Sequence, residues 1–216
     1  QLRWDDSWSS PSTDMNLYLF DPSFATLVDL SVNYQNGGAF QIPREYLSYN
    51  APYSGNYNIV VQHVSGPIPD WLQVQIFIGN DLGIFTEGHS IANPAESADP
   101  ALIAVGAASI LDVSEIETYS SRGPTMDGRV KPDLVSYDQI LTSSRPYNFP
   151  GTSAAAPHVA GLAAVSRDRF ESYSAENISN YLKTNSISPT GTTDNIWGHG
   201  LVSLPFLTPT VPRNVS

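Results

Sequence analysis

Cysteine is absent from this sequence of 216 residues, and basic residues are scarce. Without cysteine the chain can form no disulfide, no thiolate nucleophile and no thiolate metal site, and the redox compartment is left open. Lys and Arg number 10 against 21 Asp and Glu, and the formal net charge of −11 disfavours nucleic acid and anionic membranes as partners. No run of about 18 apolar residues occurs, so no membrane-spanning helix is expected.

The residues that are present predict a folded chain. Hydrophobic residues make up 41% of the sequence and charged residues only 14%, whereas a disordered chain has more charge and fewer aromatic residues. The length suits one large domain or two small ones.

The first part of the chain alternates between β-forming segments and turn residues. Segments 57–64 (YNIVVQHV) and 71–78 (WLQVQIFI) are rich in β-branched and aromatic residues, and similar segments occur at 16–20 and 26–32. Gly, Pro, Asn and Asp separate them, and no helical periodicity is present. We expect residues 1–78 to form an antiparallel β-sandwich.

From residue 79 onward strands alternate with helices. Residues 101–107 (ALIAVGA) are a short apolar run, typical of a strand buried on both faces, and a second strand is expected at 140–142. Alanine-rich sequence after Ser153 predicts one helix, and a second is expected at 175–184. Ser174 is the candidate N-cap of the second helix.

These elements predict the fold class and the domains. Residues 79–206 are expected to form an α/β unit, with a parallel sheet and helices, joined to the β-sandwich of residues 1–78. Residues 207–216 (LTPTVPRNVS) are expected to be a linker or tail.

The segment FPGTSAAAPHVAGLA, residues 149–163, is the first indication of chemistry. A helix that begins near Ser153 directs unpaired N–H groups and a partial positive charge toward that serine, and both stabilise an oxyanion. Gly151 allows close approach of a substrate, and Pro157 is expected in the first turn, where its missing N–H costs little. The alternative from this pattern alone is that Ser153 only caps a buried helix.

The segment GTSAAAPHVAG, residues 151–161, resembles the active-site serine motif of the subtilisin-like serine peptidases (subtilases, peptidase S8 family). Three more segments occur in the order and spacing of that family's catalytic domain: ALIAVGAA at 101–108, TYSSRGPTMDGRVKPDLV at 118–135 and WGHGLV at 197–202. The resemblance covers residues 94–204, about half of the chain.

The resemblance implies a catalytic role for Ser153. Ser153 would be the nucleophile that attacks a peptide carbonyl, and its own N–H would contribute to the oxyanion hole. The parent protein would be a serine endopeptidase acting on polypeptides, secreted by a bacterium. Residues 1–78 would be a β-rich insertion of the kind that some bacterial subtilases carry.

The family's catalytic Asp and His segments do not occur in this sequence. On a helix, His158 would lie about 140° around the axis from Ser153, so a packing or hydrogen-bonding role is expected for it. Structural or surface roles are expected for His63 and His89. We therefore interpret the chain as a C-terminal fragment of the peptidase, inactive by itself.

Two other assignments of catalytic partners are open. Asp194 and His199 follow Ser153 in the chain order of the α/β-hydrolases, but that fold requires Gly-x-Ser-x-Gly and Ala155 replaces the second glycine. Asn80 lies near the position of the family's oxyanion asparagine in an unbroken domain, although an ordinary turn is favoured there.

One segment departs from the family. Where subtilases typically read Lys-Pro-Asp-Val-Val-Ala-Pro-Gly, this chain has Ser136-Tyr137-Asp138 in place of Ala-Pro-Gly. The departure motivates an alternative hypothesis, a degenerate relative used as a scaffold. A second alternative is a binding module that uses aromatic residues of the β-sandwich: Trp4, Trp8, Tyr18 and Tyr34.

No cofactor is expected, and the resemblance leaves room for calcium in the parent protein, because many subtilases use it. Asp5, Asp6 and Asp14 lie close in sequence but match no calcium-loop pattern, so solvated turns are favoured. If the sheet of residues 79–206 lacks strands, its exposed edge predicts self-association.

Overall fold

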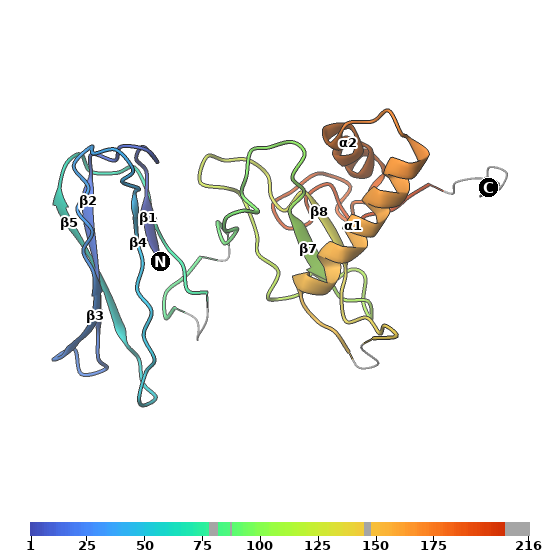
Figure 1. The fold of residues 1–216 in the computed structure, drawn as a ribbon. Helices are drawn as coiled ribbons and strands as arrows, with labels where there is room; N and C mark the ends of the chain where they lie inside the picture. Colours follow the sequence, from blue (N-terminus) through green and yellow to red (C-terminus); the bar gives the residue numbers. More distant parts are fainter. Residues whose placement is uncertain (78–81, 87, 145–147, 206–216) are drawn as a thin grey trace. The chain divides into compact units, whose positions relative to one another are not determined.

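The computed structural model describes residues 1–77, 82–86, 88–144 and 148–205. The chain divides into two compact units, Gln1–Phe85 and Thr86–Ser216. The domain boundaries expected after residues 78 and 206, and the tail at 207–216, lie outside the described residues and stay predictions. Figure 1 shows strands in the first unit and both helices in the second.

The first unit consists of two three-stranded antiparallel sheets (Figure 1). One has the order β4-β1-β6 and the other the order β3-β2-β5. The strands are β1 Leu2–Trp4, β2 Asp14–Phe20, β3 Leu27–Ser31, β4 Arg44–Glu45, β5 Asn58–Ser65 and β6 Leu72–Val74.

Both sheets contribute to one hydrophobic cluster. Leu2 and Trp4 of β1 pack with Met15 and Leu17 of β2, and each of these side chains is at most 2% exposed. Successive residues of a strand point to opposite faces. Met15 and Leu17 therefore face the core and are buried, whereas the next residue, Tyr18, faces the other way and is only half-buried. Of the aromatic residues considered for binding, Trp4 is core, whereas Trp8 and Tyr34 are exposed.

The strand expected at 71–78 is shorter than predicted. Residues Leu72–Val74 form β6, Gln75 to Phe77 are not in a strand, and residue 78 lies outside the described residues. Gln73 is buried while Leu72 is 47% exposed. The reason is a polar pair: the Arg3 guanidinium on the adjacent strand donates to the Gln73 side-chain oxygen.

The second unit has a short parallel sheet with a helix packed on it. Strands β7 (Val105–Ala108) and β8 (Leu134–Tyr137) pair in parallel, and helix α1 (Thr152–Arg169) packs against both. Helix α2 (Ala175–Asn185) packs against α1. Figure 1 shows α1 running across the two strands.

Two strand predictions in this unit need correction. The strand expected at 101–107 covers only Val105–Ala108, because the carboxylate of Asp133 accepts from the Ala104 N–H at 2.7 Å and ends the regular pairing there. The strand expected at 140–142 is a single bridge between Ile140 and Phe149; the preceding Leu134–Tyr137 is the regular strand.

The predicted second helix is confirmed. It spans Ala175–Asn185, and Ser174 and Asn177 form a reciprocal capping box at its start. Ile178 and Leu182 are buried in a cluster with Leu134 and Val159. Among the described residues, neither helix has the length and hydrophobicity needed to cross a membrane.

Candidate active site

Helix α1 begins at a glycine whose backbone adopts a positive φ. Gly151 is the N-cap, with φ of 106°, a region that residues with a Cβ rarely adopt. Its carbonyl accepts from the N–H of Ala154 at 2.8 Å and of Ala155 at 3.3 Å. Ser153 is the second helical residue and its side chain is exposed.

The Ser153 hydroxyl is available for chemistry. It makes no hydrogen bond to any described residue, and the Ser153 N–H belongs to the first helical turn, where N–H groups have no acceptor within the helix. No side chain caps α1 and no acidic residue lies in its first turn. An oxygen that became negatively charged beside Ser153 would therefore meet a free donor and the positive end of the helix.

The position of Pro157 differs from the prediction. It lies inside α1 as the sixth residue rather than in the first turn, because the helix begins at Thr152. Proline has no N–H, so the Ser153 carbonyl receives no helical hydrogen bond from it.

Asp138 is the site residue that the sequence reasoning missed. It follows β8 directly, its side chain is fully buried, and its Oδ2 atom accepts from the Gly151 N–H at 2.7 Å. The Tyr119 hydroxyl donates to the same oxygen. The signal was present in the sequence: Asp138 stands in the segment that departs from the family, where a glycine is typical.

His158 makes a hydrogen bond, one of the two roles expected for it. Its Nδ1 atom lies 3.0 Å from the Tyr137 carbonyl oxygen. Because a carbonyl only accepts, Nδ1 carries the proton, which ties the second turn of α1 to the end of β8.

The rival pair of Asp194 and His199 is not assembled. The Asp194 carboxylate accepts from the N–H of Ile196 and of Trp197 and from the Thr190 hydroxyl, so it organises its own turn. Burial and the nearby Lys183 ammonium lower the pKa of His199, while Asp133 acts in the opposite direction. His63 contacts the Gly66 carbonyl within its own turn.

A buried ion triplet supports β8, the strand that precedes Asp138. The Asp133 carboxylate lies 2.6 Å from the Lys131 Nζ and 2.9 Å from the Lys183 Nζ. Burial alone would raise the pKa of Asp133, but the hydrogen bonds from Lys131, Lys183 and the Ala104 N–H lower it. The triplet therefore joins β8 to α2 and to the residue before β7.

The WGHGLV segment pairs with β8 along the edge that faces away from β7. The Val135 N–H donates to the Gly200 carbonyl at 2.9 Å, and the Val202 N–H donates to the Val135 carbonyl at 2.8 Å. Gly200 has φ of 115°, and a Cβ there would lie 2.4 Å from the Ile187 carbonyl oxygen. Only glycine fits this close approach.

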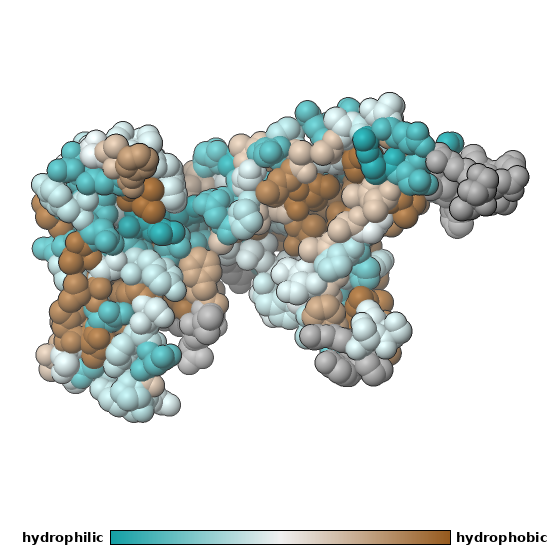
Figure 2. Space-filling model, in the orientation of Figure 1, coloured by the Kyte–Doolittle hydropathy of each residue, from teal (hydrophilic) through white to brown (hydrophobic). Residues whose placement is uncertain are grey.

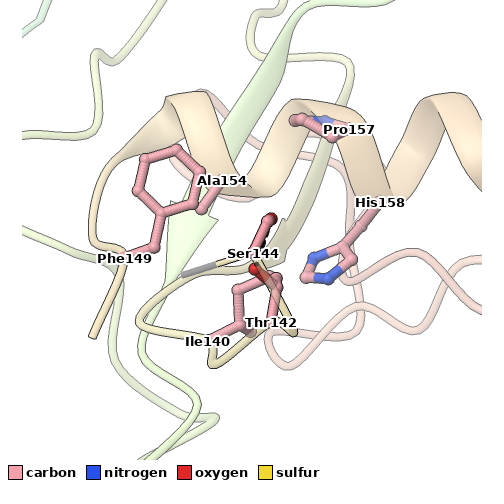
Figure 3. A pocket seen from close by; sticks show the side chains of 7 residues that line it. All are labelled: Ile140, Thr142, Ser144, Phe149, Ala154, Pro157 and His158. Carbon is pink, nitrogen blue, oxygen red and sulfur yellow. Dashed lines mark hydrogen bonds between the residues drawn. The ribbon is translucent and has the colours of Figure 1, made fainter. Parts of the chain in front are cut away.

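A cavity of 330 Å³ lies beside the first turns of α1. Figure 3 shows Ala154, Pro157 and His158 of α1 on one side and Ile140, Thr142, Ser144 and Phe149 around them. Ala154 directly follows Ser153 in the sequence, but Ser153 itself does not line this cavity.

No metal site is found among the described residues, which contain no group of three or more His, Cys, Asp or Glu side chains able to hold an ion. Of the acidic residues considered, Asp6 accepts from the N–H groups of Ser7, Ser12 and Thr13. These bonds hold the Asp6 carboxylate within its own turn. Asn80 lies outside the described residues.

Comparison with protein families decides the relationship. The profile described as "Subtilase family" matches residues 74–200, more than half of the chain. The chain belongs to the subtilase family. Its serine motif and ion triplet lie within the matched residues, as do residues 197–200 of the WGHGLV segment.

Individual relatives agree. The subtilase chain is 32% identical over 148 residues to "Bacillopeptidase F" of Bacillus subtilis, covering 62% of this chain and 10% of that protein. It is 29% identical over 159 residues to "Extracellular serine protease" of Serratia marcescens, covering 72% and 15%. The chain thus spans a small part of the length of these relatives.

A solved structure also resembles this subtilase chain. The crystal structure of MycP1 from Mycobacterium smegmatis matches with 22% sequence identity and a TM-score of 0.41, covering 56% of this chain and 37% of that one. No statement about the site rests on this likeness.

Proposed function

We propose that Ser153 is the nucleophile of a serine endopeptidase and that its substrate is a polypeptide. The observation that carries the proposal is the exposed Ser153 hydroxyl, without a hydrogen-bond partner among the described residues, at the start of α1 in a subtilase chain.

The chemistry follows from the groups around Ser153. A base removes the hydroxyl proton as Oγ bonds to the peptide carbonyl carbon, and the carbonyl electrons move to its oxygen. The Ser153 N–H and the helix N-terminus stabilise that oxyanion. Its collapse expels the amine, which takes the proton from the base, and water then releases the acid from the acyl-enzyme by the same steps.

We further propose that the base comes from outside these 216 residues, so that this chain alone is inactive. The His158 ring is hydrogen-bonded to the Tyr137 carbonyl, and no imidazole among the described residues bonds to the Ser153 hydroxyl. The family's Asp and His segments do not occur in the sequence. A serine without its base retains only residual reactivity.

The exposed face of α1 supports a second segment beside it. Small, exposed residues follow Ser153 along one face of α1, three or four positions apart: Ala156, Pro157, Ala160, Gly161 and Ala164. Figure 2 shows mostly pale colours where α1 runs in Figure 1, with teal at the end of the helix that leads toward α2. Small side chains allow close packing of another helix, which would also cover an apolar surface.

Labelling with a fluorophosphonate probe tests this proposal. The chain alone should react slowly, and adding a polypeptide that carries a subtilase Asp and His segment should accelerate labelling at Ser153 by about a thousandfold or more. Ser153→Ala should abolish the label, while Ser172→Ala, which removes an exposed hydroxyl between the helices, should not. Rapid labelling of the isolated chain would overturn the need for an outside base.

The remaining assignments are also proposals. Residues 1–78 would be an insertion and 79–206 the C-terminal segment of the catalytic domain, in a protein that acts outside the cell, as the name of the Serratia relative suggests for that relative. Self-association through an exposed sheet edge would appear as a concentration-dependent mass. If the chain is instead a binding module, the exposed Trp8 and Tyr34 are its candidate contacts.

A further inference from the structure

Asp138 has a fixed backbone at the end of β8. The strand pairs Tyr137 with Ala108 in parallel register, and the Asp138 N–H then donates to the Ala108 carbonyl at 3.1 Å. Its side chain is fully buried. The carboxylate therefore has little freedom relative to the sheet.

The two carboxylate oxygens of Asp138 are used unequally. Oδ2 accepts from the Gly151 N–H at 2.7 Å and from the Tyr119 hydroxyl. Oδ1 is buried and has no hydrogen-bond partner among the described residues. A buried carboxylate oxygen without a partner costs free energy, so stability alone does not favour aspartate at this position.

The bond to Gly151 acts on the start of α1. The Gly151 carbonyl accepts the first hydrogen bonds of the helix, so the position of Gly151 determines where the helix begins. His158 adds a second attachment, because its Nδ1 donates to the Tyr137 carbonyl at 3.0 Å. Two successive residues at the end of β8 thus hold α1 on either side of Ser153 in the sequence.

We propose that Asp138 is a positioning residue for Ser153: its buried carboxylate, oriented by the Tyr119 hydroxyl, holds Gly151 and so directs the serine oxygen at the substrate carbonyl. The proposal rests on the proposed nucleophilic role of Ser153. Correct placement of a reacting group contributes much of an enzyme's rate, and an error of about 1 Å can cost a hundredfold.

Tyr119 is itself fixed by the sheet. The N–H of Glu117, two residues earlier, donates to the Ala107 carbonyl at 3.0 Å, and the Ser120 hydroxyl accepts from the Ala107 N–H at 3.0 Å. Burial of the hydroxyl and its bond to Asp138 raise the pKa of Tyr119 to about 12, so Tyr119 remains a donor at neutral pH.

The first test needs no catalysis. In NMR spectra of the 216-residue chain, the Gly151 amide proton should lie downfield and exchange slowly, because its acceptor is a carboxylate. Asp138→Ala should move it upfield and accelerate its exchange at least tenfold, and Asp138→Asn should have an intermediate effect. Asp112→Asn, which changes an exposed carboxylate bonded only to Ser114, is the control. An unmoved Gly151 signal in Asp138→Ala would overturn the proposal.

The second test measures the reaction in the chain supplemented with the Asp and His segments. Asp138→Ala should lower kcat about tenfold or more with little change in KM, Asp138→Asn should restore part of the loss, and Tyr119→Phe should lower kcat less. Equal kcat in all variants would overturn the positioning role. If Asp138→Ala does not fold, Tyr119→Phe, which alters a half-exposed ring, supplies both readouts.

The two proposals fail in different ways. If Ser153 is not the nucleophile, the wild-type chain will not label at Ser153, whereas the Gly151 amide will still respond to Asp138. If Asp138 does not position the serine, labelling will persist at the wild-type rate in every Asp138 variant that folds.

Discussion

The Gly151 N–H donates a hydrogen bond of 2.7 Å to the carboxylate of Asp138, across 13 positions of sequence. This bond joins the end of β8 to the residue that begins α1. In the typical family sequence a glycine stands where this chain has Asp138, so the contact depends on a side chain that the family pattern does not supply.

Gly151→Ala should destabilise the second unit by about 1–2 kcal/mol, because a residue with a Cβ is strained at a φ of 106°. The cost should be conformational rather than steric, since the nearest atom to an added Cβ is the Ser153 nitrogen at 3.7 Å. Urea unfolding measures it. Gly161→Ala is the matched control: it lies inside α1 with open space around it and should stabilise by about 0.5–1 kcal/mol. Equal effects of both variants would contradict the strained start of the helix.

Asp133→Asn should cost about 3–5 kcal/mol, because it leaves the buried Lys131 ammonium without its counter-charge. Asp127→Asn removes a carboxylate paired with Arg129 at the surface, 61% exposed, and should change stability by less than about 1 kcal/mol. Chemical denaturation of both variants provides the comparison. A small loss for Asp133→Asn would show that the triplet does not support β8.

Stability should fall as the pH rises from 10 to 12, in part through Tyr119. Its pKa is about 12 in the folded chain against an ordinary value of 10. A raised folded-state pKa stabilises the fold fully below pH 10, and this contribution is lost as the pH approaches 12. Tyr119→Phe should therefore flatten the curve of unfolding free energy against pH. Tyr46→Phe, an exposed ring in the first unit, should leave the slope unchanged. Identical slopes for wild type and Tyr119→Phe would refute the assignment.

Ala160→Leu should leave the isolated chain folded but prevent its activation by the Asp and His segments. The reason is that leucine adds bulk to the exposed small-residue face of α1 where another helix is proposed to pack. Asn180→Leu, an exposed position of α2, is the control. Binding measured by calorimetry should weaken at least tenfold for Ala160→Leu only. Unchanged binding would place the partner segment elsewhere.

Local sequence was sufficient for several elements. The strands at 16–20, 26–32 and 57–64 and the helix after Ser174 occur close to their predicted places, because β-branched runs, turn residues and a capping box act over a few neighbours. In the strand at 71–78 the apolar alternation gave no sign that the Arg3 guanidinium would draw the Gln73 side chain inward and leave Leu72 exposed.

The candidate site was predictable only in part. The position of Ser153 at a helix start and the hydrogen-bonding role of His158 follow from helical geometry. Pro157 was placed a turn too early, because the start of α1 depends on Gly151 and its acceptor rather than on helix propensity.

The sequence by itself determined that Ser153 lies at the start of a helix of small residues and that segments resembling the subtilase motifs lie in order around it. Those features depend on residue types at fixed spacing. The tertiary structure alone decided that Asp138, Tyr119 and Gly151 meet, and that Asp133 lies between two lysines. Contacts of this kind need the parallel pairing of β7 with β8, which brings together segments that are remote in sequence and gives a buried carboxylate the donors it requires.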